Sequence, residues 1–359
     1  MNTRIIKCID NSLGKLLAHV LFKSVQTLIN RTSKVLIIRP GGIGDAILLT
    51  PAINQIKKHN PIVHITVLAE CRNRFVFSMM SDVDEVLCYD IPKEFVKALT
   101  SRYDVVIDSE QWYRLSAVVA RVIRAPVKIG FGTNERQRMF THVIAYDSSA
   151  YESLNFTSLL KPLGIENKSI QGDLTESLVL PSLKETNAAN ILTELMHRKF
   201  VVIFPGASIK EKCWEVRKFR LVAESLYEAG YGIVAVGGQD EKSDGAFISK
   251  GLGANLAAQT TLQETAAVVA KSSLLISGDS GILHIAALLG IPTVSLFGPS
   301  SVAKWAPKGE QHIALTKRLL CSPCSRYSTI PACQHTICCM TEITPDEVIS
   351  AAKQLLKVN

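Results

Sequence analysis

Apolar residues recur along the chain in two alternating patterns, which together predict an α/β protein. Short stretches rich in apolar residues, typical of buried parallel strands, occur at 35–38, 64–68, 85–88, 105–108 and 127–129. Apolar residues spaced three or four positions apart lie between such runs, as from Ile47 to Ile56, and predict helices. A chain that alternates strand and helix in this way forms βαβ units and a parallel sheet.

The alternation begins again after a more polar connection at about 164–184. A helix is expected over 186–196, then strands at 200–204, 232–236, 274–276 and 293–296, with helices over 218–229, 262–270 and 284–289. A chain of 359 residues is long enough for two such domains. We predict domains over 33–180 and 181–344, and a C-terminal segment 345–359 whose helix returns to the first domain. Two doubly wound domains bind ligands at the carboxyl ends of their strands, at the mouth of the cleft between them.

Residues 1–32 form a separate N-terminal extension. Its apolar residues fall on one helical face: Ile5, Ile9, Leu13, Leu16, Leu17, Val20, Leu21, Val25, Leu28 and Ile29. The other face holds Lys7, Lys15, His19, Lys23 and Arg31. A basic amphipathic helix either lies in a membrane interface or packs on the protein's own body, and the sequence leaves both readings open.

Composition and charge narrow the class of protein. Apolar residues make up 47% and charged residues 20%, which excludes a disordered chain. The formal charge of +8 is concentrated in residues 1–34 and 114–138, which favours an anionic partner. We expect no nucleic acid, because no nucleic-acid-binding motif is present and the aromatic residues are not interleaved with basic ones. With no apolar run of about 18–20 residues and no secretory signal, a cytoplasmic location is predicted, with the nine cysteines reduced.

Three glycine-containing turns follow predicted strands and carry the candidate chemistry. They are Pro40-Gly41-Gly42-Ile43-Gly44-Asp45, then Phe204-Pro205-Gly206-Ala207-Ser208 with Lys210 and Lys212 beyond it, and Gly278-Asp279-Ser280-Gly281 with His284 beyond it. Glycine lets the backbone approach a ligand, and free amides at a helix start bind anions. Neither a dinucleotide fingerprint nor a P-loop is present, since Ile47 replaces the last glycine of the former and no Gly-Lys-Ser/Thr occurs.

Each of these residues has a structural reading beside the functional one. Asp45 either complements the charge of a helix start or acts as a general base. Lys212 is either solvated or bound to a phosphate, and His284 is either packed in its helix or catalytic. Asp82 and Asp84 have the Asp-x-Asp spacing of metal-dependent transferases, but they stand in a polar turn away from the glycine loops, so a structural role is expected.

Taken together, the segments 37–52, 204–214 and 278–287 resemble glycosyltransferase family 9, the family of ADP-heptose:lipopolysaccharide heptosyltransferases. The resemblance extends from about Lys34 to the C-terminus. It implies the GT-B architecture, two facing Rossmann-like domains of the α/β class, and an inverting transfer without a metal. Asp45 is then the base and Lys212 the phosphate contact. Expected donor contacts are Gly206, Ala207, Ser208, Glu241, Thr260, Asp279, Ser280, Gly281 and His284. Expected acceptor contacts are Gly41, Gly42, Gly44, Arg121, Arg124, Arg136 and Arg138.

The resemblance also implies the partners: ADP-heptose as donor, and an anionic lipid A–inner core acceptor at the inner face of the inner membrane. No cofactor is expected. Glu215 stands where the family often has proline, so another nucleotide sugar or acceptor stays open. A catalytically inactive sugar-nucleotide-binding protein is a further alternative, disfavoured by the retention of both Asp45 and Lys212.

A cysteine-rich segment near the C-terminus offers four soft ligands, Cys321, Cys324, Cys333 and Cys338. These thiols suit a structural zinc ion. Only one close Cys-x-x-Cys pair is present, so reduced and packed thiols are the favoured reading.

Overall fold

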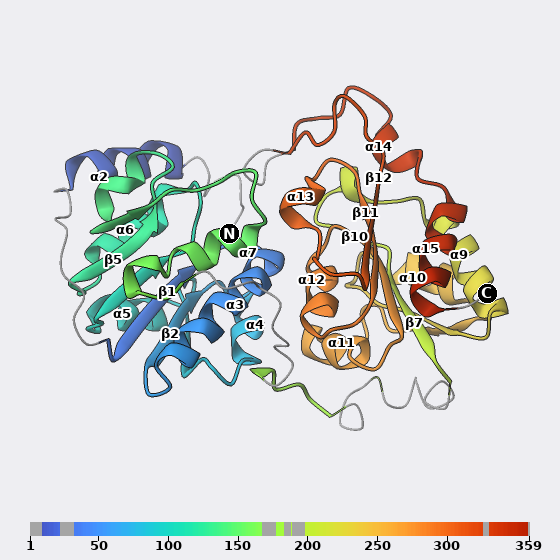
Figure 1. Cartoon of the computed structure of the whole chain (residues 1–359), viewed down its shortest axis with the longest axis horizontal. Helices are drawn as coiled ribbons and strands as arrows, with labels where there is room; N and C mark the ends of the chain where they lie inside the picture. The colour runs from blue at the N-terminus through green and yellow to red at the C-terminus, as the bar shows by residue number, and fades with distance from the viewer. Residues whose placement is uncertain are drawn as a thin grey trace. The chain divides into compact units, whose positions relative to one another are not determined.

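The computed structural model describes residues 9–21, 32–166, 177–182, 188, 198–325 and 330–357. The chain divides into two compact units, Met1–Leu178 and Val179–Asn359 (Figure 1). The predicted helix over 186–196, apart from residue 188, and the predicted apolar positions Ile5, Val25, Leu28 and Ile29 lie outside the described residues.

The first unit contains a six-stranded parallel sheet in the order β3-β2-β1-β4-β5-β6. The strands are β1 (Lys34–Arg39), β2 (His64–Ala69), β3 (Glu85–Cys88), β4 (Val105–Asp108), β5 (Val127–Phe131) and β6 (His142–Ile144). The helices are α2 (Lys15–Val20), α3 (Ile43–His59), α4 (Arg74–Ser78), α5 (Pro92–Thr100), α6 (Arg114–Val122) and α7 (Glu152–Ser158). Apolar residues of α5 and α6 pack on one face of the sheet, and α3 packs with α7.

The second unit repeats this topology, with the strand order β12-β11-β10-β7-β8-β9. Its strands are β7 (Phe200–Phe204), β8 (Gly232–Ala235), β9 (Gly253–Asn255), β10 (Leu274–Gly278), β11 (Thr293–Phe297) and β12 (His312–Thr316). Its helices are α9 (Val216–Glu228), α10 (Lys242–Ser249), α11 (Leu262–Val269), α12 (Gly281–Leu288), α13 (Val302–Trp305), α14 (Cys338–Thr341) and α15 (Pro345–Leu356). In both units the chain reverses its direction across the sheet next to the first strand, at β1/β4 and at β7/β10. Ligands of doubly wound sheets bind at this switch point.

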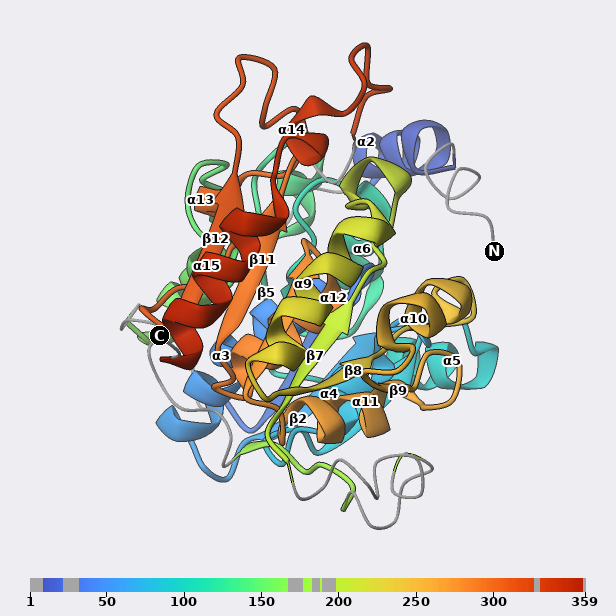
Figure 2. The same ribbon diagram turned by 90° about the vertical axis from the view of Figure 1, so that its right-hand side faces the viewer.

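The C-terminal helix forms as predicted, but its predicted packing on the first domain is wrong. α15 lies beside α9 against the second sheet, as Figure 2 shows. Its apolar residues Val348, Ala351 and Ala352 are buried in the core of that unit. Trp214 of the same core donates its indole N–H to the Ile343 carbonyl, at 3.1 Å, and thereby fixes the entry to the helix. The second unit therefore completes its own core.

Asp82 and Asp84 have the structural role expected of them. Asp84 accepts a 2.8 Å hydrogen bond from the Ile65 backbone and pairs with Lys57 at 3.0 Å. Asp82 accepts from the Asn54 amide at 2.8 Å. No helix among the described residues is both long and apolar enough to cross a bilayer.

Candidate active site

The first candidate site lies at the switch point of the first sheet, after β1. Gly41 has a φ of +101°, a backbone conformation that favours glycine, and Gly42 caps the start of α3. Asp45 therefore stands in the first helical turn, where a carboxylate complements the helix dipole. Gly44 lies in the same turn. The predicted turn geometry is present, and it places the Asp45 side chain at the carboxyl edge of the sheet.

A second strand end supplies a partner for Asp45. The Gln111 side-chain amide, which follows β4, lies 3.4 Å from Asp45 Oδ1 and 2.7 Å from Glu152 Oε1. Tyr146 donates its hydroxyl to Glu152 Oε2 at 2.8 Å. Burial and the Glu152 carboxylate raise the pKa of Tyr146, so the phenol stays a donor. Among the described residues no cation forms an ion pair with Asp45. Its carboxylate is thus positioned by an amide and remains available to take up a proton.

A buried ion pair supports the edge of the sheet beneath this turn. The Arg39 side chain is 2% exposed and its guanidinium lies 3.1 Å from Glu110. It also donates to the backbone oxygens of Pro40, at 2.6 Å, and Ser109, at 3.0 Å. Arg39 thereby ties the end of β1 to the end of β4. Neither the Arg39–Glu110 pair nor the Gln111–Asp45 contact stands out in the sequence, because the two partners are 71 and 66 residues apart.

The four arginines predicted to bind the acceptor have different environments. Arg136 is fully buried, and its guanidinium lies 2.5 Å from the buried Asp108 carboxylate. Its assignment to the acceptor is wrong, since the side chain that pairs with Asp108 has no surface left for a ligand. Arg124 is exposed, Arg121 is half-buried at the end of α6, and Arg138 donates to the His19 carbonyl at 3.3 Å.

The second candidate site lies at the switch point of the second sheet. Lys212, in a short turn after β7, places Nζ 2.6 Å from Asp279 Oδ2 at the end of β10. His284 Nε2 lies 4.0 Å from the other carboxylate oxygen, and Ser300 donates to the same group. Burial alone would raise the pKa of Asp279, but Lys212, His284 and these hydrogen bonds more than offset it, so the pKa is lowered. The resulting carboxylate orients the lysine.

The start of α12 lies directly beyond Asp279. Ser280 caps the helix by accepting from the Leu283 amide, and its hydroxyl also lies 2.8 Å from that of Ser277. The first amides of a helix have no partner within it, so those of Gly281 and Ile282 are available to an anion. His284 is buried inside this helix beside Asp279, so the structure favours its packed role.

Glu241 follows β8 and is enclosed by two glycines. Its Oε2 accepts from the Gly238 amide at 2.7 Å. A Cβ at Gly206 would lie 2.3 Å from Glu241 Oε1, and one at Gly237 would lie 2.5 Å from Glu241 Cβ. Only glycine at these positions lets the carboxylate stand next to the turn after β7. The structure therefore brings the predicted residue Glu241 together with Gly206.

The remaining predicted donor residues border the same edge. Ala207 and Ser208 follow β7, and Ser208 is exposed. Thr260 lies beyond β9, with its hydroxyl 2.9 Å from that of Thr265. The strands β9, β8, β7 and β10 lie side by side in this order, and the residues that follow them are, in the same order, Thr260, Glu241, Lys212 and Asp279.

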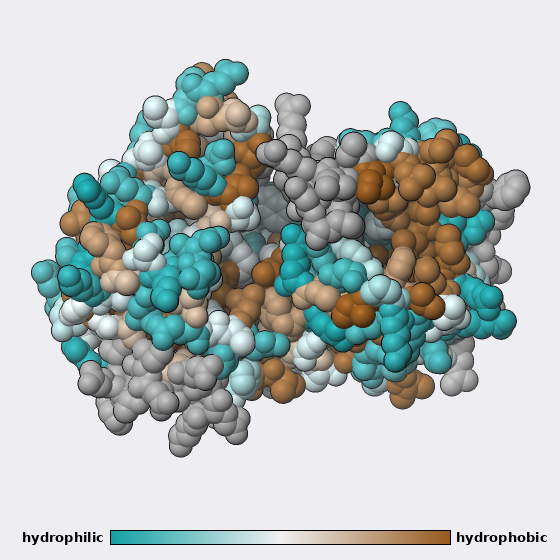
Figure 3. All heavy atoms as spheres, turned by 180° about the vertical axis from the view of Figure 1, so that it is seen from behind, coloured by the Kyte–Doolittle hydropathy of each residue, from teal (hydrophilic) through white to brown (hydrophobic). Residues whose placement is uncertain are grey.

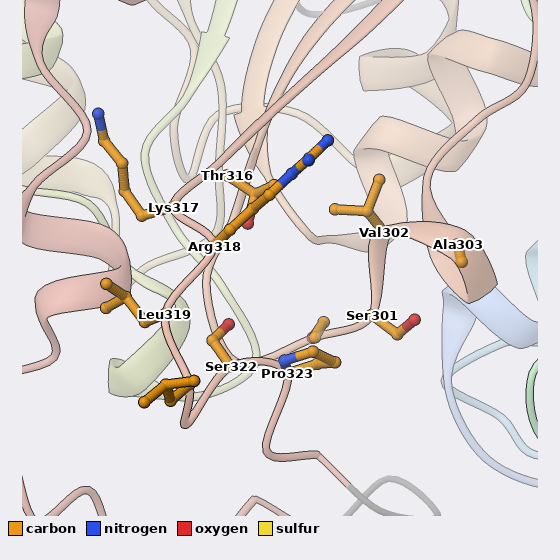
Figure 4. Close-up of a pocket in the computed structure, with 11 residues that line it drawn as sticks. Ser301, Val302, Ala303, Thr316, Lys317, Arg318, Leu319, Ser322 and Pro323 are labelled. Carbon is orange, nitrogen blue, oxygen red and sulfur yellow. The ribbon is translucent and has the colours of Figure 1, made fainter.

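A hollow of about 320 Å³ continues this edge at the ends of β11 and β12 (Figure 4). Ser300, which bonds Asp279, lines it together with Ser301, Thr316 and Arg318. In Figure 4 the Arg318 side chain extends toward Val302, whereas Lys317 points away and pairs with Glu347 at 2.6 Å. Hydroxyls and a guanidinium suit a hydroxylated or anionic group.

The predicted cysteine ligands do not meet as a metal site in the described part of the chain. There, the one set of three ligand atoms within 4.8 Å of one another belongs to Cys71, Cys88 and Asp90. Near the C-terminus, burial and neighbouring thiols raise the pKa of Cys339 to about 11, which keeps that thiol protonated.

Comparison with known proteins identifies the family of the chain. The sequence profile of glycosyltransferase family 9 (heptosyltransferase) matches residues 93–335. The chain is 30% identical to lipopolysaccharide heptosyltransferase 3 of Escherichia coli over 295 residues, which cover 74% of this chain and 83% of that protein.

Two solved structures share the fold. One is a family 9 glycosyl transferase from Veillonella parvula, with a TM-score of 0.73 and 20% identity over 92% of this chain and 99% of that one. The other is ADP-heptose lps heptosyltransferase II of E. coli, with a TM-score of 0.70 and 23% identity over 90% and 98%. The resemblance read from the three turns is thereby confirmed: the chain belongs to glycosyltransferase family 9, the heptosyltransferase family, and is a transferase enzyme of the GT-B fold.

Proposed function

We propose that this enzyme transfers heptose from ADP-heptose to the anionic inner core of a lipid A-based acceptor, with inversion and without a metal ion. The donor proposal follows the names of the relatives and the order of groups along the second sheet edge. The observation that carries it is the Lys212–Asp279 ion pair beside the start of α12. The Lys212 ammonium group and the unpaired backbone amides of the first helical turn lie at the same switch point, where a diphosphate can bind both.

The transfer step needs a base on the acceptor and stabilisation of the departing diphosphate. Asp45 takes the proton from an acceptor hydroxyl, whose oxygen forms a bond to the anomeric carbon of the sugar. The bond from that carbon to the β-phosphate oxygen breaks, and ADP leaves with the electron pair. Lys212 and the amides of Gly281 and Ile282 stabilise the negative charge that develops on it. A cationic side chain and helix amides supply the charge that a metal ion supplies in other transferases.

The cellular location of the enzyme and its association with a membrane are part of the same proposal. A lipid-borne acceptor requires the enzyme to act at a membrane surface, and a nucleotide-sugar donor is a cytoplasmic metabolite. We therefore place the enzyme in the cytoplasm at the inner face of the inner membrane.

The test combines donor binding with one variant. Thermal shift with ADP, UDP and GDP should show selective stabilisation by ADP, because a ligand that binds only the folded state raises its stability. Asp45→Asn should abolish transfer while leaving the ADP-induced shift unchanged. Equal shifts with all three nucleotides would support another nucleotide sugar as donor, and wild-type turnover of Asp45→Asn would exclude Asp45 as the base.

A further inference from the structure

The helical segment that precedes the first sheet has apolar side chains on its outer surface. This segment, residues 9–20, is a π-helical turn (Asp10–Gly14) that continues into α2. Four of its apolar side chains are exposed: Ile9 at 37%, Leu13 at 47%, Leu16 at 59% and Val20 at 68%. Their spacing of four, three and four residues places them on one helical face, which we call the outer stripe. Exposed apolar residues in a row indicate an interaction surface.

The opposite face of the segment is fixed to the unit. Asp10 is buried, and its carboxylate accepts from the backbone N–H groups of Arg114, at 2.7 Å, and Leu115, at 2.8 Å. It therefore caps the start of α6 from a distant part of the chain. Gly14 and Ala18 are also buried, and a Cβ at Gly14 would lie 3.3 Å from Arg114 Cβ. These contacts set the rotation of the segment, so the outer stripe must face away from the sheet.

Basic residues lie on the segment that carries the outer stripe and on the elements packed against it. Lys15 is exposed on the same segment, and α6, which packs against it, leads to the exposed Arg124. Arg138 bonds the His19 carbonyl at the end of α2. Of the acidic residues here, Asp10 is buried and Glu135 is paired with Arg114 at 2.8 Å. Figure 3 shows hydrophobic surface gathered over the end of this unit where α2 lies.

We propose that the outer stripe docks onto an anionic lipid bilayer, with α2 lying flat in the interface. An apolar face with basic residues beside it matches the acyl boundary and the phosphate headgroups of such a surface. A second copy of this chain is a poorer partner, because it would bring the same cations against each other. The inference deepens the proposed function and rests on its lipid-borne acceptor: it brings the unit that holds Asp45 to the surface that holds the substrate.

Sedimentation of the full chain with vesicles tests the proposal. Wild type should bind vesicles that contain about one third anionic phospholipid and bind zwitterionic vesicles much less. The variant Leu13→Ser/Leu16→Ser/Val20→Ser should reduce the partition coefficient tenfold or more. The matched control is Val96→Ser/Leu221→Ser, two residues exposed at 56% and 51% on α5 and α9, which should bind like wild type. Lys15→Glu should weaken binding to anionic vesicles only.

The outcomes separate docking from catalysis. Transfer to a water-soluble acceptor fragment and the thermal midpoint should be unchanged in the stripe variant, which excludes misfolding. Unchanged vesicle binding of the stripe variant, or an equal loss in the control, would overturn the proposal. So would a wild-type dimer that the stripe variant converts to monomer without any lipid binding. If the chain binds vesicles through the outer stripe but shows no selectivity for ADP, the proposed donor is refuted and the proposed membrane docking is still supported.

Discussion

Lys212 and Asp279 lie beyond the ends of two adjacent strands of the second sheet, β7 and β10, and meet at 2.6 Å between Nζ and Oδ2. The lysine side chain is 18% exposed and the carboxylate 9%. Because the carboxylate is held by several donors, the ammonium is fixed in place at the edge where parallel-sheet ligands bind. Such preorganised charge stabilises a leaving group without reorganisation during the reaction.

Replacing this lysine tests its contact with the diphosphate. Lys212→Ala should lower kcat about 100-fold or more, since loss of one preorganised electrostatic contact typically has that effect. Lys210 stands two residues earlier in the same short turn and is exposed. Lys210→Ala is therefore the matched control, with kcat and donor KM near wild type in steady-state assays. Equal losses in the two variants would show that the turn contributes only general positive charge.

The lowered pKa of Asp279 predicts a pH dependence of stability. A carboxyl group whose pKa is depressed by folding stabilises the protein above its unfolded pKa, and this contribution disappears as pH falls through the folded pKa. Asp279→Asn should lower the free energy of unfolding at pH 7 by about 3 kcal/mol, since it leaves Lys212 unpaired. Urea titrations from pH 7 toward pH 3 should show this difference from wild type shrinking. Asp240→Asn, at an exposed position, should show neither effect.

The pair of glycines around Glu241 predicts a graded effect of added side-chain volume. A methyl group at Gly206 meets the Glu241 carboxylate at 2.3 Å, whereas one at Gly238 meets it at 3.4 Å, an ordinary contact. Gly206→Ala should therefore displace Glu241 and weaken ADP binding about tenfold, as for loss of one hydrogen bond to a charged group. Gly238→Ala should change affinity little. Calorimetric titration with ADP measures the affinity of both variants. Equal affinities would show that Glu241 does not contact the nucleotide.

The central strands and the three glycine-containing turns were predicted from the sequence because both signals are local. A short stretch rich in apolar residues identifies a central parallel strand, and strand-turn-helix order places Asp45 and Lys212 at sheet edges. The edge strands β6, β9 and β12 were missed: β6 and β9 are only three residues long, and the apolar part of β12 is flanked by polar residues at both ends. Gln111 was missed for another reason: its partners Asp45 and Glu152 are 66 and 41 residues away, and no local pattern encodes such a meeting.

Gln111 should act on catalysis through Asp45. Gln111→Leu removes the amide that contacts Asp45. We expect kcat to fall about tenfold, because the Asp45 carboxylate is then less well oriented toward the acceptor hydroxyl. Gln111→Glu places a second carboxylate beside Asp45, the proposed base. Because two neighbouring carboxylates disfavour each other's ionisation, the acidic limb of the kcat–pH profile should move to higher pH. A purely structural role for Gln111 would leave this limb in place. Gln137→Leu, at an exposed position in the same unit, is the control.

Arg136 shows that a basic stretch in a sequence does not reveal which of its side chains are buried and which are exposed. It belongs to the same basic stretch as Arg124, yet the structure buries it against Asp108 at 2.5 Å and leaves Arg124 exposed. Arg136→Met should destabilise the first unit by about 3–5 kcal/mol, because it leaves the buried Asp108 carboxylate without its ion-pair partner. Arg124→Ala should change stability by no more than about 0.5 kcal/mol. Denaturant unfolding compares the two. If Arg136→Met instead kept wild-type stability and raised only the acceptor KM, the arginine would bind substrate and its buried pairing would be refuted.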